Sequence, residues 1–360
     1  MTLSEGNGDI VSDSPSIRPS ARPFVSPGAR LRSLLMFIAA VCLALGVHLF
    51  IYRNVTGSGV RHYTIFLCLV LGVALVTAPF QLLPGGLHRW RQDMHPILIA
   101  AALFLCFWEI ITTGLQSLTL GAVGNDSMRM ILEKITLPLP YFPGPEKVLK
   151  NLISDRGLLF ESTWHSLILL MSGYALGVLA GLISGVCIGW SPSIRYWGMP
   201  IIKLVGPIPA TAWIPFAMVV FPSTVFSSAA LIALAVWFPV TMLTASGISN
   251  TRASYLDVAR TLGANERYLI FRVAVPAALP NIFIGLFMGL GASFLTLVVA
   301  ETVGVKSGLG WYVSWAQGWA EYGKVFAALV IMAAFFSTIM TVLFKVRDRL
   351  LVWQKGVIKW

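Results

Sequence analysis

Few residues in this sequence have the types and spacings that support catalysis. Ser184 and Ser293 fall inside long apolar segments, but neither lies in the Gly-x-Ser-Gly pattern of an intramembrane serine protease. The apolar segments contain no aspartate pair, and the chain has no His-Glu-x-x-His pattern for zinc. The four cysteines are spaced for neither a zinc site nor a disulfide framework. We therefore expect no catalytic residue, no metal site and no cofactor in this chain.

Nucleotide binding is also not expected of this chain alone. A phosphate-binding loop needs a glycine immediately before its Lys-Ser or Lys-Thr pair, because backbone N–H groups there surround the phosphates. Lys306 and Ser307 form such a pair, but Val305 precedes them. Any ATP that powers this protein must therefore be bound by a partner.

Two acidic residues and a group of prolines interrupt the apolar segments. Ionisable groups inside a membrane are costly and mark functional positions by default. For Glu301 two roles stay open, capping or pairing between helices and lining a transport path, whereas Glu109 is expected to pair with a neighbouring helix. Pro207 and Pro209 remove backbone donors in mid-segment, and broken helices at membrane depth usually border a cavity, although a kink for packing is the alternative. We take Pro207, Pro209 and Glu301 as the candidate translocation path.

The elements that carry these residues are predicted to be membrane-spanning helices. Hydrophobic residues make up 57% of the chain and charged residues 11%, and the mean hydropathy is +0.79. A bilayer core of about 30 Å requires roughly 20 mostly apolar residues per helix. The sequence thus predicts an all-α polytopic protein with about eight transmembrane helices. These lie near 34–52, 63–83, 95–115, 167–190, 201–221, 225–245, 280–300 and 325–345.

Basic residues predict the orientation. The net charge is +11, and most of the 26 Lys and Arg residues fall in the segments that lie inside if the N-terminus is cytoplasmic. We therefore expect a multi-pass protein of the cell membrane in contact with lipid, with both termini cytoplasmic, and no nucleic-acid partner. Residues 1–32 are rich in serine and proline, which predicts a disordered cytoplasmic tail.

The fourth predicted span carries five glycines at intervals of four residues. This spacing places them on one side of a helix, where a second helix can approach closely. Packing within the chain is the expected role, in preference to a dimer seam or a substrate path. The glycines are Gly173, Gly177, Gly181, Gly185 and Gly189.

The loop at 246–279, between the sixth and seventh spans, is polar but has helix signals. Ser254 is expected to cap a first helix and Gly263 to end it in a left-handed conformation. Asn265 is expected to cap a second short helix. Pro276 is expected either to end that helix or to begin the next one. These two helices would form a compact cytoplasmic knob.

The same loop carries a specific resemblance. It has Asp257, Val258 and Ala259, then three residues, Gly263, nine residues, and a segment from Val273 to Pro276. This pattern resembles the loop of permeases of binding-protein-dependent ABC importers, which reads Glu-Ala-Ala, three residues, Gly, nine residues, Ile-x-Leu-Pro. The spacing agrees throughout, and the substitutions are conservative.

Further segments are similar to one branch of that family, the nitrate, sulfonate, taurine and bicarbonate permeases. The similar segments are PGPEKVL at 143–149, GPIPA at 206–210, VVAETVG at 298–304 and SGLG at 307–310. The resemblance implies a type I importer core of six spans at 95–353, with two additional helices at 33–94 and a cytoplasmic tail at 354–360. The two additional helices lie outside it.

The resemblance also implies partners and a function. The loop would couple two cytoplasmic ATP-binding subunits to this chain, a second permease copy would complete a homodimer, and an external binding protein would deliver a small anion. The coupling residues would be Asp257, Val258, Ala259, Gly263, Val273 and Pro276. A stand-alone secondary transporter or channel, an intramembrane enzyme and a membrane scaffold remain the alternatives.

Overall fold

The computed structural model describes residues 27–52, 58–77, 87–114 and 141–354. Within these ranges every regular element is helical and no strand occurs, which confirms the all-α prediction. The chain divides into two compact units, one of residues 1–53 with 64–107 and the other of residues 54–63 with 108–360. Residues 1–26 and 355–360 of the two predicted tails lie outside the described residues, whereas 27–32, predicted to be disordered, form the start of helix α1 (Pro27–Ile51).

The first unit contains three apolar helices, α1 (Pro27–Ile51), most of α2 (Ser58–Thr77) and most of α3 (Leu87–Glu109). Apolar side chains from all three pack together. This core consists of Phe37, Ala40, Val41, Ala74 and Ala102. One polar contact also joins α1 to α2, because the Nε2 atom of the fully buried His48 lies 2.9 Å from Thr64 Oγ1.

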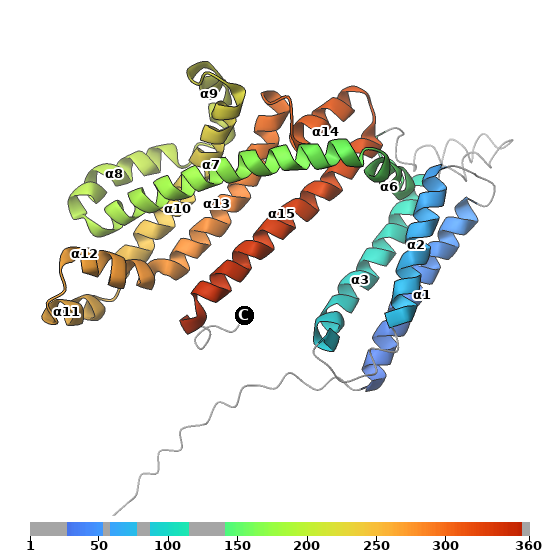
Figure 1. Cartoon of the computed structure of the whole chain (residues 1–360), viewed down its shortest axis with the longest axis horizontal. Helices are drawn as coiled ribbons and strands as arrows, with labels where there is room; N and C mark the ends of the chain where they lie inside the picture. The colour runs from blue at the N-terminus through green and yellow to red at the C-terminus, as the bar shows by residue number, and fades with distance from the viewer. Residues whose placement is uncertain (1–26, 53–57, 78–86, 115–140, 355–360) are drawn as a thin grey trace, which may run out of the picture. The chain divides into compact units, whose positions relative to one another are not determined.

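The second unit is the larger and is assembled around three long helices, α7 (Arg156–Trp190), α10 (Thr224–Ser249) and α13 (Val275–Val303) (Figure 1). Before and after them come α6 (Pro145–Ser154) and α15 (Tyr322–Leu350). Shorter helices connect these elements. They are α8 (Pro192–Val205), η3 (Ala210–Trp213), α9 (Ile214–Val220), α11 (Ala253–Thr261), α12 (Glu266–Tyr268), η4 (Leu269–Ala274), α14 (Leu309–Gly318) and η5 (Val352–Gln354).

The five regularly spaced glycines of α7 lie against α10. A Cβ atom added at any of them would meet an atom of α10 at 2.5 to 2.9 Å, closer than real Cβ contacts allow. At Gly173, for example, the obstacle is the Ile232 side chain, and at Gly177 it is the Ala233 carbonyl oxygen. Only glycine therefore permits these two backbones to approach so closely.

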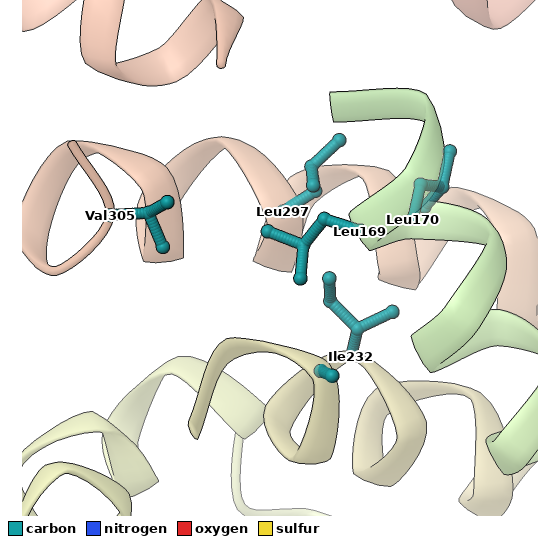
Figure 2. Packing of buried hydrophobic residues seen from close by; sticks show 6 residues of the cluster. Leu169, Leu170, Ile232, Leu297 and Val305 are labelled. Carbon is teal, nitrogen blue, oxygen red and sulfur yellow. The ribbon is translucent and has the colours of Figure 1, made fainter. Parts of the chain in front are cut away.

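Larger side chains fill the space beyond the glycine contact. Leu169 and Leu170 of α7, Ile232 of α10, Leu297 of α13 and Val305 after it gather in one buried cluster (Figure 2). Hydrogen bonds add direction to this packing. The Tyr174 hydroxyl of α7 donates to the Leu286 carbonyl of α13 at 3.0 Å, and Trp237 Nε1 of α10 donates to Ser184 Oγ of α7 at 3.0 Å.

Six of the described helices are long and apolar enough to cross a membrane, and a seventh span results if one bent pair is counted as a single crossing. That pair is α8 with η3 and α9, which meet at an angle of 84°. The predicted fifth span at 201–221 is thus a broken segment and not one helix. The predicted second span corresponds to a shorter apolar helix at Val60–Val76, beyond which the described range soon ends.

Candidate functional site

The loop at 246–279 forms a helical knob at the end of the second unit (Figure 1). α10 ends at Ser249, α11 runs from Ala253 to Thr261, and a turn leads into α12. Arg252, and not Ser254, occupies the N-cap position of α11, and its side chain makes no capping hydrogen bond. The prediction that Ser254 caps this helix was therefore wrong by two residues, because Ser254 already lies in its first turn.

Gly263 ends α11 in a left-handed conformation with φ of +82°. The Ala264 N–H donates to the Ala259 carbonyl at 3.0 Å, and the Gly263 N–H donates to the Arg260 carbonyl at 2.9 Å. These two bonds make up the Schellman arrangement that satisfies the last carbonyl groups of a helix. The sharp turn therefore depends on the backbone freedom of glycine at this one position.

The second arm of the knob runs directly into the membrane helix. The Asn265 side chain accepts the Tyr268 N–H at 2.9 Å and so caps α12. The helix then continues through the π-helical turn η4 into α13, and Glu266–Val303 forms one candidate span. Pro276 sits in the first turn of α13 and does not stop the helix. The second arm of the knob is thus continuous with the membrane helix.

The knob exposes apolar side chains that a water-facing loop would normally bury. Leu262 is 82% exposed, Val258 is 59% exposed and Tyr255 is 52% exposed. Together with Ala259, Gly263 and neighbouring residues they border a hollow of about 510 Å³. Asp257 lies on the same helix and pairs with Arg260 at 3.4 Å. Such an exposed apolar patch with charged residues beside it is typical of a protein–protein contact.

A second hollow lies where the predicted fifth span is broken. Its volume is about 290 Å³, and it is bordered by the break, by the middle of α10 and by α13. Pro209 lines this hollow, whereas Pro207 and Glu301 are not among its lining residues. Thr211 and Thr296 contribute hydroxyl groups, and Phe238 and Pro239 contribute apolar walls.

Nothing in the local sequence pattern pointed to Phe238 or Thr296 as neighbours of the proline segment. The placement of Phe238 depends on Gly206, where a Cβ atom would overlap the Phe238 ring. The GPIPA segment at 206–210 therefore has two separate effects. Its glycine admits the aromatic ring of α10, and its prolines break the helix.

Glu301 is buried, with 1% of its surface exposed, at the end of α13. Its Oε1 atom accepts the Ser166 hydroxyl of α7 at 2.6 Å, and its Oε2 atom accepts the Gly310 N–H of α14 at 2.8 Å. The carboxylate therefore connects three helices. Of the three residues assigned to the path from sequence, only Pro209 borders the hollow at the break.

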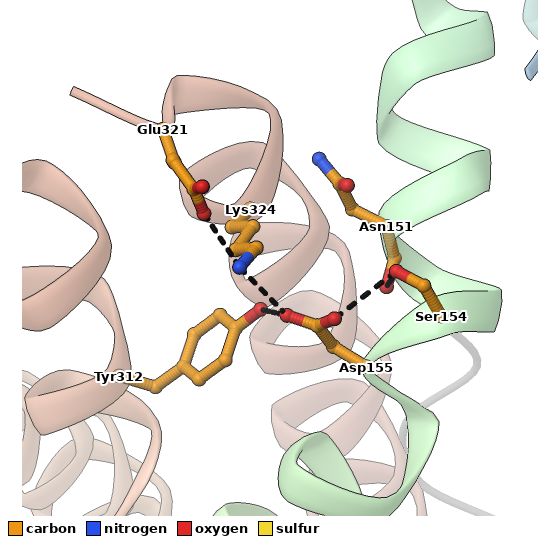
Figure 3. A network of polar contacts seen from close by, with 6 residues as sticks. All are labelled: Asn151, Ser154, Asp155, Tyr312, Glu321 and Lys324. Carbon is orange, nitrogen blue, oxygen red and sulfur yellow. Dashed lines mark hydrogen bonds and ion pairs between the residues drawn. The ribbon is translucent and has the colours of Figure 1, made fainter. Parts of the chain in front are cut away.

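A polar network fixes the other side of α14 (Figure 3). The Tyr312 hydroxyl donates to Asp155 Oδ2 at 2.8 Å, and Lys324 Nζ lies 3.4 Å from the same oxygen. Lys324 also pairs with Glu321. Burial, together with the hydrogen bond to Asp155, raises the pKa of the Tyr312 hydroxyl far above its usual range, so that it stays protonated and donates.

Glu109, the second acid of the spans, is fully buried.

Comparison with known proteins agrees with this architecture. Residues 177–352 match the family model described as the binding-protein-dependent transport system inner membrane component. The chain is 31% identical over 279 residues to the taurine transport system permease protein of Escherichia coli, covering 75% of this chain and 94% of that protein. It is 31% identical over 245 residues to a putative aliphatic sulfonates transport permease protein of Bacillus subtilis, covering 68% and 82%. It is 28% identical over 286 residues to the bicarbonate transport system permease protein of Synechococcus elongatus, covering 77% and 95%.

Proposed function

Because the chain belongs to the inner membrane components of binding-protein-dependent transport systems, as a permease of the ABC class, we propose that its knob couples ATP hydrolysis to the uptake of a small anion. The permease is a non-catalytic membrane subunit, so ATP is hydrolysed by two partner subunits in the cytoplasm. The observation that carries this proposal is the exposed apolar surface of α11, held by the turn at Gly263.

Rigid transmission is the physical reason for placing the ATPase contact here. When a partner moves α11, the Schellman turn resists bending, and the capped helix beyond it continues into α13. α13 in turn packs through Gly285 and Gly289 against α10. A shift of the knob therefore moves long helices as a body, as alternating access requires.

The distribution of basic residues supports the orientation of this scheme. The knob itself carries Arg252, Arg260, Arg267 and Arg272, and the end of α15 carries Arg347 and Arg349. By the positive-inside rule both regions face the cytoplasm, and so do both termini of the chain. α14 then lies on the outer side, because it follows the opposite end of α13.

The translocation path is proposed to pass the hollow at the broken segment. The described residues that line it include hydroxyl groups but no carboxylate, which suits an anionic substrate. The relatives transport taurine, aliphatic sulfonates and bicarbonate, and we extend their small oxyanion class, with nitrate, to this chain. A second permease copy is proposed as the partner that completes the path.

A matched pair of substitutions tests the coupling surface. Val258→Asp places a charge on the exposed face of α11 and is expected to abolish co-purification of the ATPase subunit with the tagged permease. Val352→Asp is the control, because Val352 is 57% exposed against 59% for Val258 and lies outside the knob. Retention of the ATPase by Val258→Asp at the level of the control would contradict the proposal.

The substrate class is tested separately with the complete transporter in vesicles. The binding protein loaded with a labelled anion is added outside the vesicles, and ATP is supplied inside. One of four anions, a sulfonate, taurine, bicarbonate or nitrate, should then be taken up. Competition by the other three anions then ranks them. Uptake of an uncharged solute only, with no anion transported, would refute the anion assignment while leaving the ATPase coupling intact.

A further inference from the structure

Glu301 and Ser166 together cap a helix that has no cap of its own. Gly308, at the N-cap position of α14, has no side chain to accept the free N–H groups of the first turn. The Ser166 hydroxyl oxygen accepts the Leu309 N–H at 2.9 Å, and Glu301 accepts the Gly310 N–H. A carboxylate at a helix N-terminus also interacts favourably with the helix dipole. The cap of α14 thus comes from two other helices, α7 and α13.

The glycines of the SGLG segment are required by this contact. A Cβ atom at Gly308 would come within 2.8 Å of Glu301 Oε2, and one at Gly310 would come within 2.6 Å of the Val298 carbonyl oxygen. The backbone of Gly308 also has φ of +102°, a conformation that residues with a side chain rarely adopt. The backbone of the turn therefore fits around the buried carboxylate.

A second set of contacts, at Tyr312, also holds α14 in place. Its hydroxyl bonds to Asp155 at the start of α7, and Asp155 in turn contacts Lys324 near the start of α15 (Figure 3). α14 is consequently tied to α7, α13 and α15. Beyond these ties the end of α14 is exposed at Gln317 and Gly318, and Trp319, directly after the helix, is 70% exposed.

The position of α14 determines which partner can reach it. The knob precedes α13 and α14 follows it, so the two lie at opposite ends of a helix of 29 residues. That helix is about 44 Å long at 1.5 Å per residue. If the knob meets the ATPase, α14 faces the compartment from which a binding protein delivers its substrate. A large exposed aromatic residue at the end of a fixed helix is a common anchor of protein interfaces.

We propose that α14 is a docking surface for the loaded binding protein and that Glu301 is a positioning residue for this contact. Together with Ser166, Glu301 fixes α14 in the position that the binding protein recognises. The inference rests on the proposed function and adds a role that differs from lining the path. Without the clamp α14 populates other positions, and a protein that binds only one of them shows a weaker apparent affinity. Glu301 therefore acts through α14 and not by contact with the anion.

Serine substitutions provide a matched test in the reconstituted transporter. Ser166→Ala removes both the bond to Glu301 and the acceptor for Leu309, whereas Ser293→Ala removes an equally buried hydroxyl that bonds only within α13. Ser166→Ala should raise the concentration of loaded binding protein that gives half-maximal ATP hydrolysis at least about fivefold, the effect expected from the loss of even one of these two hydrogen bonds. The maximal rate and the amount of bound ATPase should stay within twofold of wild type, and Ser293→Ala should change neither quantity.

Two further variants separate positioning from general stability. Glu301→Gln keeps an acceptor for Gly310 and should restore most of the affinity that Glu301→Ala loses. Trp319→Ala removes the surface but not the clamp and should also raise the half-maximal concentration. An unchanged half-maximal concentration in Ser166→Ala, an equal loss in Ser293→Ala, or an effect on the maximal rate alone would overturn the inference. Failure of the wild-type chain to retain an ATPase would instead refute the proposed function.

Discussion

Replacement of Gly263 by valine tests the link between the knob and transport directly. No atom lies within 4 Å of the position where a Cβ atom would be added, so lack of space does not oppose the substitution. The backbone does, because φ is +82° and a non-glycine residue in the left-handed region costs roughly 1 to 2 kcal/mol. That energy lowers the ratio of the native turn to its alternatives by about 5- to 30-fold.

The turn lies at the exposed surface, and the spans do not depend on it. We therefore expect Gly263→Val to express and insert normally, while the anion transported per ATP hydrolysed falls measurably, by at most that factor. Gly263→Asn should lose less, because asparagine tolerates the left-handed conformation better than other residues. Gly157→Val is the matched control, since Gly157 is equally open but lies in α7 without a positive φ.

The assay compares uptake and ATP hydrolysis in the same vesicles, each with and without loaded binding protein. A Gly263→Val transporter whose substrate-stimulated hydrolysis and uptake both equal those of wild type would refute the reasoning. So would the same loss in Gly157→Val, because an effect of added side-chain bulk in general would then explain the result.

Two other substitutions probe the packing of the second unit. Gly181→Leu should destabilise the contact of α7 with α10 by several kcal/mol and reduce the yield of folded protein, because a Cβ atom alone would meet the Val240 side chain at 2.8 Å. Ala180→Leu, on the exposed side of the same helix, is the control and should be tolerated. Similar yields of the two variants would argue against close packing at Gly181. Tyr312→Phe removes the donor to Asp155 and should lower the free energy of unfolding by about 1 kcal/mol in a detergent melt, whereas Tyr196→Phe, on an exposed side chain, should have no measurable effect.

Local pattern was sufficient for the parts of this protein that follow from the geometry of a single helix. Glycines spaced by four must share one side of α7, and apolar length alone predicts most of the spans. The position of Gly263 just after an apolar stripe likewise predicted a helix end. The start of α11 was misplaced by two residues, because a serine two positions further on carried the stronger capping signal.

The contacts between distant segments could not be derived in this way. Ser166 and Glu301 are 135 residues apart in sequence, and Gly206 and Phe238 come from helices joined by a broken span. No periodicity records which helices become neighbours, because that choice depends on the simultaneous packing of all of them. For the same reason, assigning Pro209 to the hollow and Glu301 to the cap of α14 required tertiary structure. The sequence by itself predicted a helical membrane permease and the loop that we propose to be its coupling element, and the packing of α7, α10, α13 and α14 decided where the polar groups between these helices lie.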